Sequence, residues 1–275
     1  MGTMKSLPDA TVLEHLAPPH SRPNPLSGDE TAWRLSSYLG MRDEALVPLL
    51  HQERSPTGDE QHIHSVLRDK ILGAEFPCVA AKSALNRRNY RLGVYGQMGQ
   101  LDTARALCHD LYEFGREFPD PGQQFVSFMA VFRWPELRSE LHFEQLMWRH
   151  LQLMHLVDMR HYRWNDSVSS NPEHKDFSYS IGGRPYFLVG FNPHASRLAR
   201  AFPWAMIVFN LHEQFEHLRE QGRYDTLKNA IRERDVAYQG SINPVLRDFG
   251  DQSEARQYSG RAVESAWKCP FRAKI

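Results

Sequence analysis

The spacing of hydrophobic residues changes along the chain, and this change predicts which segments are helices and which are strands. In "TARALCHDLYEFGREF" (103–118) the apolar residues recur every three or four positions, so they share one face of a helix. Asp102 precedes this segment and is the expected N-cap. The same reasoning predicts helices at 41–53, 60–73 (ending at Gly73), 139–158 and 225–236.

Other segments have the short hydrophobic runs that are typical of β-strands. "QFVSFMAVF" (124–132) and "WAMIVF" (204–209) are rich in aromatic and β-branched residues. "DFSYSIGGRPYFLVGF" (176–191) contains two such runs joined by Gly182 and Gly183, which is the pattern of a two-residue β-hairpin. The order of helices, strand, helix, hairpin, strand and helices predicts an α+β fold, a single domain whose mainly antiparallel sheet is surrounded by helices.

The start of the chain is polar and shows no hydrophobic pattern of its own. Residues 17–31, "APPHSRPNPLSGDET", are rich in proline, serine and charge, with little to bury. We therefore expect residues 1–30 to form a flexible N-terminal arm and residues 31–275 to form the folded domain. At 275 residues the chain is long enough to bury a substantial core.

The composition argues against several classes of function. Lys+Arg and Asp+Glu are equal at 33 each, so no net charge favours nucleic acid or an anionic membrane. The longest apolar runs, such as "FLVGF" (187–191), are too short to span a bilayer, and the first residues carry no export signal. We therefore expect a cytoplasmic protein without a nucleic-acid or membrane partner.

The cysteines are few and widely spaced. Cys78, Cys108 and Cys269 show no CxxC spacing, which argues against a disulfide framework and against a zinc knuckle. Cys269, in "WKCPF" (267–271), could serve as a thiolate ligand of a haem iron. A buried structural thiol between its aromatic neighbours is the favoured interpretation.

Histidines are more informative, because a neutral imidazole is the commonest metal ligand in proteins. In "VFNLHEQFEHLRE" (208–220), Asn210 and Glu213 resemble a capping box, which puts His212 in the first turn of a helix. A helix N-terminus disfavours the imidazolium form and leaves a neutral ring that can bind a metal. These residues alone nevertheless favour the alternative, a ring that donates to a carbonyl at the rim of the core. His217 points toward solvent.

Two further histidines lie on the predicted helix 139–158. His150 falls within an apolar stripe, and His155 lies beside that stripe among apolar neighbours. Each is a core histidine first and a metal-ligand candidate second. "HIH" (62–64) lies in a polar helical stretch and is interpreted as solvated surface.

The loop "GFNPHASRLARAF" (190–202) follows the predicted hairpin, where functional groups often gather. His194 comes directly after the turn, and Arg197 and Arg200 follow it. Two arginines suit an anionic cofactor such as a haem with its propionates. A surface turn with solvated arginines explains the same pattern equally well.

The segment "SEARQYSGR" (253–261) is a dense group of polar residues. Glu254, Arg256 and Arg261 are close in sequence and could recognise a charged substrate. The same residues could instead tie the C-terminal segment to the domain.

Several blocks of the chain resemble the signature segments of the YqcI/YcgG family. They occur in the family's order and together cover roughly residues 65–271. The blocks are "FPCVAAKSALNRRNYRLGVYG" (76–96), "FSYSIGGRPYFLVG" (177–190), "SRLARAF" (196–202), "FNLHEQFEHLRE" (209–220), "QGSINPVLRDFGDQSEARQYSGR" (239–261) and "WKCPF" (267–271).

The resemblance implies a function. Some members of the family are haem proteins that N-hydroxylate guanidino groups during natural-product biosynthesis. It therefore implies a haem b-dependent monooxygenase that converts L-arginine to N-omega-hydroxy-L-arginine, as in antibiotic biosynthesis of the D-cycloserine type. The alternatives are another guanidino substrate, a haem-binding sensor or carrier without turnover, and a cofactor-free interaction protein.

The resemblance also ranks the histidines. His212 stands in the family's "FNxHxQFExLR" block and becomes the expected iron ligand, with His155 as the alternative. The family more often has a His-Pro pair before "SR", where this chain has Asn192-Pro193. Whether His194 takes over a role in the haem pocket is left open by that departure, and we treat it as the catalytic candidate.

The remaining expected roles follow the chemistry of haem and arginine. Arg197 and Arg200 are expected to bind the cofactor, and Glu213, Glu254 and Arg256 the guanidino substrate. No flavin or iron–sulfur motif is visible, so electrons for O2 activation are expected from an external donor. A homodimer is compatible with the sequence.

Overall fold

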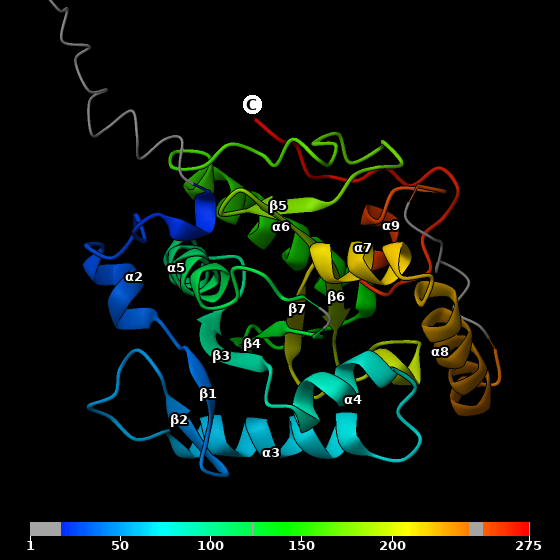
Figure 1. Cartoon of the computed structure of the whole chain (residues 1–275), viewed down its shortest axis with the longest axis horizontal. Helices are drawn as coiled ribbons and strands as arrows, with labels where there is room; N and C mark the ends of the chain where they lie inside the picture. Colours follow the sequence, from blue (N-terminus) through cyan, green and yellow to red (C-terminus); the bar gives the residue numbers. More distant parts are fainter. Residues whose placement is uncertain (1–17, 123, 242–249, 275) are drawn as a thin grey trace, which may run out of the picture.

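The computed structural model describes residues 18–122, 124–241 and 250–274, in which a seven-stranded sheet separates two layers of helices (Figure 1). The strand order is β2-β1-β3-β4-β7-β6-β5. Only the β3–β4 pair is parallel in this sheet, which confirms the predicted α+β fold with a mainly antiparallel sheet. The strands are β1 (Leu39–Arg42), β2 (Ala45–Pro48), β3 (Tyr90–Gln97), β4 (Ser127–Trp134), β5 (Tyr179–Ile181), β6 (Arg184–Phe191) and β7 (Ala205–Leu211).

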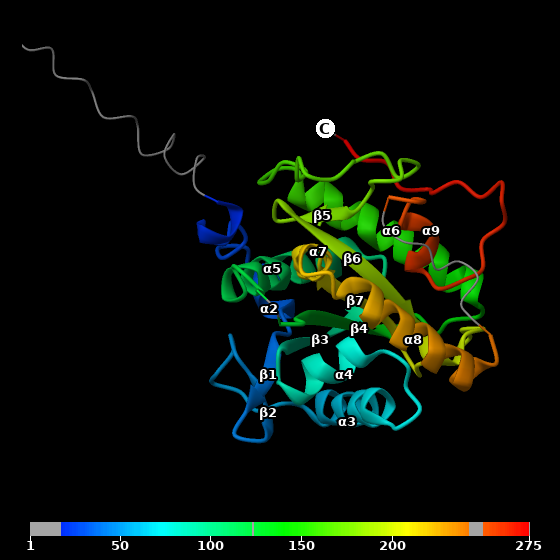
Figure 2. The same ribbon diagram turned by 45° about the vertical axis from the view of Figure 1, so that its right-hand side comes forward.

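Helices cover the two faces of the sheet unequally. α5 and α6 lie on one face, and α3 and α4 lie on the other, while α7 and α8 follow β7 (Figures 1 and 2). No helix of the described residues is long and apolar enough to cross a membrane. The helices are α2 (Glu30–Leu35), α3 (Gly58–Leu72), α4 (Val79–Asn86), α5 (Leu101–Glu117), α6 (Glu140–Asp158), α7 (Glu213–Glu220), α8 (Tyr224–Gln239) and α9 (Ala255–Tyr258), with short 3-10 turns η1 (Pro19–Ser21) and η2 (Leu198–Arg200).

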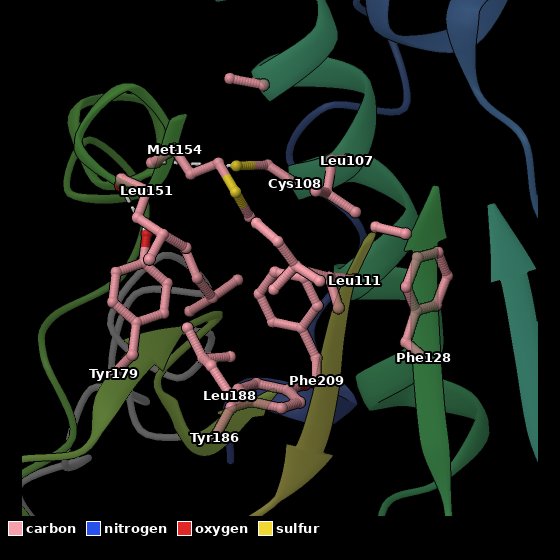
Figure 3. Packing of buried hydrophobic residues seen from close by; sticks show 14 of the residues in the cluster. Leu107, Cys108, Leu111, Phe128, Leu151, Met154, Tyr179, Tyr186, Leu188 and Phe209 are labelled. Carbon is pink, nitrogen blue, oxygen red and sulfur yellow. Dashed lines mark hydrogen bonds between the residues drawn. The ribbon is translucent and has the colours of Figure 1, made fainter. Parts of the chain in front are cut away.

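The larger core lies between the sheet and helices α5 and α6 (Figure 3). Phe128, Leu188 and Phe209 project into it from the neighbouring strands β4, β6 and β7. The hydroxyl of Tyr179 donates to the carbonyl of Leu151 at 2.6 Å, so even the polar atom of this buried ring is paired. Burial of these side chains is the main favourable contribution to folding of this layer.

Alternate residues of the same strands face the other layer. Phe187, Val189 and Val208 point to the face that α3 and α4 cover. A cavity beside α8 lies on the same face of the sheet.

The predicted hairpin is confirmed. β5 and β6 pair through Ile181 and Arg184, so Gly182 and Gly183 form a two-residue turn. Their φ angles are 62° and 69°, a left-handed conformation that glycine adopts at little cost.

The helix predicted at 41–53 is wrong. This segment forms the β1–β2 hairpin, in which Asp43 and Glu44 make the turn with φ angles of 47° and 66°. β1 also pairs with β3, so tertiary pairing outweighs local helix preference, and Pro48 would interrupt a helix.

Helix boundaries and one burial assignment differ from the sequence predictions. α3 ends at Gly73 as expected, but α5 begins after Gln100, so Asp102 is not its N-cap. His64, predicted to be solvated, is 8% exposed, and its Nε2 lies 2.6 Å from the hydroxyl of Tyr90.

The first described residues pack against α5. Asn24 is 3% exposed and donates to the carbonyl of His109 at 3.1 Å, and Leu26 is also buried. Residues 1–17 of the predicted flexible arm lie outside the described residues. Residues 18–30 are therefore attached to the folded part where they are described.

Candidate functional site

A cavity of about 260 Å³ lies between the sheet and helices α4, α7 and α8. Its floor is made by strands β4, β6 and β7, whose second face carries apolar side chains toward it. Side chains of both α4 and α8 also line it. The apolar part of the wall includes Ile71, Phe76, Ala80, Ala81, Met129, Phe187, Val189, Phe191, Val208, Phe215, Leu227 and Ile231.

Polar residues from distant parts of the sequence border the same cavity. His212, Glu254, Arg197 and Arg200, all singled out from the sequence, belong to this group. Ligand sites are commonly apolar cavities with a few convergent polar groups, so this cavity is the candidate functional site.

His212 is placed by the junction of β7 and α7. Asn210 does not cap this helix: it lies within β7 and receives a hydrogen bond from Ser127 Oγ at 2.7 Å. The helix cap is His212 itself, whose backbone N–H donates to the carbonyl of Pro185 at 3.0 Å. The strand therefore continues two residues further than a capping motif predicts, and this carries the imidazole to the cavity.

Both ring nitrogens of His212 have nearby oxygen atoms. Nε2 lies 2.9 Å from Oε1 of Glu216, one turn along α7. Nδ1 lies 3.4 Å from Oγ of Ser178 and 4.0 Å from Oε1 of Glu254. The hydrogen bond from His212 is the main cause that lowers the pKa of Glu216. A metal bound at Nε2 would replace Glu216 and leave Nδ1 facing Ser178 and Glu254, an arrangement typical of metal-binding histidines.

Glu254 is a buried carboxyl group on the wall of the cavity, with 4% of its surface exposed. The hydroxyl of Tyr258 donates to its Oε2 at 3.1 Å. Burial raises the pKa of Glu254 to about 7, because an ionised carboxylate is poorly solvated there. A bound cation would favour its ionised form.

The two arginines differ in their partners. Arg197 forms an ion pair with Asp235 at 2.5 Å and donates to Ser241, so its charge is compensated within the chain. Arg200 donates to the carbonyl of Gly190 at 3.1 Å and forms no ion pair within the described residues. Burial lowers the pKa of Arg200 to about 10. Arg200 is therefore the better suited of the two to hold an anion in the cavity.

Cys78 also lines the cavity and was not selected from the sequence. It is the N-cap of α4, and its sulfur accepts a hydrogen bond from the backbone N–H of Ala81 at 3.5 Å. Burial raises the pKa of this thiol, while nearby Arg200 acts in the opposite direction. Its position directly before the apolar helix segment 79–86 was the available sequence signal, because thiols at helix N-termini can be activated.

The other sequence candidates do not border the cavity. His194 Nε2 lies 2.8 Å from the carbonyl of Leu137, and Arg256 donates to the backbone carbonyls of Trp267 and Glu264. Glu213 pairs with Arg184 through both carboxylate oxygens.

The histidines of α6 lie on the opposite face of the sheet. His155 Nε2 accepts from the backbone N–H of Lys274 at 2.8 Å. His150 is fully buried, and its Nδ1 accepts from the backbone N–H of Gly99 at 3.1 Å. Burial lowers the pKa of His150 to about 3, so its ring is neutral. Cys269 is likewise buried outside the cavity, as the favoured interpretation expected.

The side chains that border the cavity include the types that would hold a haem. Among the described residues, no group of three or more His, Cys, Asp or Glu side chains could hold a metal ion alone. A haem brings four nitrogen ligands of its own and would need one protein side chain on its iron, apolar walls and a cationic partner for its propionates. His212 or Cys78, the apolar wall and Arg200 are of those three types.

Comparison with known proteins finds relatives along most of the chain. The profile of the YqcI/YcgG family matches residues 67–272. The Bacillus subtilis (strain 168) protein YcgG, itself uncharacterised, is 31% identical over 233 residues, which is 80% of this chain and 90% of YcgG. The uncharacterised YqcI of the same organism is 30% identical over 217 residues, 74% of this chain and 84% of YqcI. No solved structure matches.

Proposed function

The chain belongs to the YqcI/YcgG family, and on that premise we propose that its cavity binds haem b and serves a monooxygenase that hydroxylates a guanidino nitrogen of L-arginine. One observation carries the proposal: a single apolar cavity brings together His212, Arg200 and Glu254, which lie far apart in the sequence. They are an imidazole, a guanidinium and a buried carboxyl, the groups that a haem and a cationic substrate require.

In this proposal His212 would hold the haem iron through Nε2, which becomes available when Glu216 turns toward solvent. Glu216 is suited to that movement because its side chain is 43% exposed, whereas that of His212 is 6% exposed. Arg200 holds a propionate, and Arg197 keeps its ion pair with Asp235. When bound, the haem supplies the activation of dioxygen.

Glu254 is the proposed partner of the substrate guanidinium. A guanidinium binds a carboxylate through two parallel hydrogen bonds, and its positive charge would favour ionisation of this buried group. One oxygen atom of O2 is inserted at a terminal guanidino nitrogen to give N-omega-hydroxy-L-arginine. The other leaves as water, formed with two electrons from an external donor and two protons. We place this reaction in the cytoplasm, within antibiotic biosynthesis of the D-cycloserine type.

A second candidate is a haem-binding sensor or carrier without turnover. It rests on the same cavity and is favoured by the position of His194, because this histidine, the catalytic candidate from the sequence, does not line the cavity. Hydroxylation of a different guanidino compound is a variant of the first proposal.

Absorption spectra of the expressed protein, oxidised, reduced and with CO, test haem binding and distinguish a nitrogen ligand from a sulfur ligand. His212→Ala should lose the native spectrum and most of its haem, whereas His194→Ala, a matched histidine outside the cavity, should keep both. Loss of haem in Cys78→Ala but not in His212→Ala would assign the iron ligand to the Cys78 thiol. A colourless protein whose absorption spectrum shows no binding of added haemin would contradict both haem proposals.

Product analysis separates the enzyme from the carrier. Haem-loaded protein is incubated with L-arginine, O2 and a chemical reductant, and N-omega-hydroxy-L-arginine is measured by mass spectrometry. If the wild type forms this product and Glu254→Ala does not, the result supports the enzyme. A haem-loaded protein that binds O2 but never forms the product supports the sensor or carrier.

A further inference from the structure

Helix α8 borders the cavity but has almost no hydrophobic anchor of its own. Tyr224, Leu227, Lys228, Ile231 and Asp235 lie on one helical face and line the cavity. Of the sixteen residues of α8, Asp235 is the one that is buried, so the helix buries a charged side chain and no apolar one. Surface helices are ordinarily held by an apolar stripe, and here that stripe faces the cavity.

The carboxyl end of α8 is held by polar contacts. Asp235 pairs with Arg197 of the loop before η2, and both side chains are about nine-tenths buried, with 11% and 9% exposed. Gln239 accepts from the backbone N–H of Leu198 at 2.5 Å and donates to the carbonyl of Ser196 at 3.3 Å. These contacts connect the end of α8 to the segment 196–200. The hydroxyl of Tyr238 also accepts from Lys70 of α3 at 3.3 Å, so the contacts on this end of the helix are polar.

The amino end of α8 is joined to α7 by a short turn. Gly222 adopts a φ of 65°, and the backbone N–H of Arg223 donates to the carbonyl of Leu218 at 2.9 Å. The guanidinium of Arg219 lies 4.4 Å from the ring of Tyr224 across this turn. A helix of this length spans about 24 Å, so a small rotation at Gly222 moves the carboxyl end by a large distance.

We propose that α8 is a hinged cover of the cavity, with its hinge at Gly222 and its latch at the Arg197–Asp235 ion pair. Opening of the latch exposes the cavity between α8 and α4 and admits the ligand. The inference concerns access to the cavity and holds for any occupant, so it does not depend on the proposed haem chemistry.

Hydrogen–deuterium exchange of the full chain without added ligand tests the latch. Asp235→Asn removes the charge of the pair, and the α8 amides should then exchange about ten- to a hundredfold faster, the change expected for loss of a hydrogen bond between charged groups. Asp225→Asn is the matched control on the same helix, because Asp225 pairs with Lys228 within α8 and its side chain is 78% exposed. The control should leave α8 exchange unchanged, and amides of α5 should keep their protection in both variants.

A second variant keeps the test decisive if Asp235→Asn fails to fold. Gln239→Ala removes two uncharged hydrogen bonds of the same helix end and should accelerate α8 exchange in the same direction by a smaller factor. Unchanged α8 protection in the folded variants would overturn the latch. Equal acceleration in α5 and α8 would also overturn it, because the ion pair would then stabilise the whole fold.

Haemin serves as the probe of access. Its association rate with the full chain, measured by stopped-flow absorbance, should rise about tenfold or more in Asp235→Asn and stay unchanged in Asp225→Asn. If the variants with faster α8 exchange do not also bind haemin faster, then α8 does not control access to the cavity. If haemin binds no variant at all, the proposed function fails while hydrogen exchange still decides the latch.

Discussion

The imidazole of His212 and the carboxylate of Glu216 are joined by a contact of 2.9 Å between Nε2 and Oε1, one turn apart on α7. The side chain of His212 is almost buried, and that of Glu216 is partly exposed and also contacts Arg219. The carboxylate therefore occupies the position at which a metal would approach Nε2. The proposed binding of iron at His212 would have to break this contact, which would therefore oppose the binding.

Removal of this carboxylate should strengthen haemin binding. In Glu216→Ala the competing contact is absent, and the affinity for haemin should rise about two- to fivefold, the range expected for a partly exposed ion pair. Titration of haemin absorbance measures the dissociation constant. Glu220→Ala is the control, because Glu220 is exposed on the same helix. A weaker affinity in Glu216→Ala would argue against ligation through Nε2.

Asp158, at the end of α6, should make the stability of the protein depend on pH. Its Oδ1 accepts from the hydroxyl of Tyr112 at 2.9 Å and from the N–H of Gly182 at 2.8 Å. Burial nevertheless raises the pKa of Asp158 from its usual 3.8 to about 7. The folded state thus holds a proton that the unfolded state releases, so the stabilisation is complete below pH 3.8 and is lost as pH rises to about 7.

Asp158→Asn should remove this pH dependence, because asparagine keeps an acceptor oxygen and carries no charge. Relative to the wild type, the variant should gain free energy of unfolding between pH 4 and pH 8, by an amount on the order of 4 kcal/mol. Urea denaturation at several pH values measures it. In Asp166→Asn, at an exposed position, the free energy of unfolding should change with pH as it does in the wild type. A constant difference between Asp158→Asn and the wild type over this range would contradict the assignment.

Local signals predicted the β5–β6 hairpin and most helices, because those signals lie within a few residues. The pair Gly182-Gly183 allows the turn by itself, and the apolar stripe of 103–118 defines one helix face. The segment 41–53 failed for the opposite reason. Its conformation depends on pairing with β3, some fifty residues away, and no local sequence pattern indicates that pairing.

The residues that line the cavity were predictable in part. His212 and Arg200 were selected by chemistry and family position, and both line the cavity. Glu213 and Glu254 are chemically identical in the sequence, and only packing separates them: Glu213 pairs with Arg184, and Glu254 reaches the cavity wall. Cys78 was overlooked because the spacing of cysteines indicates disulfides and zinc sites, which need several of them. A single thiol that lines an apolar cavity leaves no such pattern in the sequence.

Gly190 is required by close packing on the face opposite the cavity. A Cβ atom there would lie 2.7 Å from a ring carbon of Phe143 and 2.7 Å from the backbone carbonyl oxygen of Tyr258. Gly190→Ala should lower the free energy of unfolding by about 1–3 kcal/mol, as overpacking does. Gly96→Ala is the control within another strand, since nothing lies within 4 Å of its added Cβ. Thermal denaturation measures both, and equal melting temperatures would contradict the close packing at Gly190.

The guanidinium of Arg200 allows a direct test of whether the cavity binds the propionates of the proposed haem. The guanidinium of Arg200 forms no ion pair within the described residues, so a propionate would supply its missing counter-charge. Arg200→Gln should therefore weaken haemin binding about tenfold. Haemin dimethyl ester, whose propionates carry no charge, should bind the wild type and Arg200→Gln equally. Arg256→Gln, outside the cavity, should bind both compounds as the wild type does. Equal weakening of both compounds by Arg200→Gln would show that Arg200 supports the wall of the cavity and does not bind the propionate.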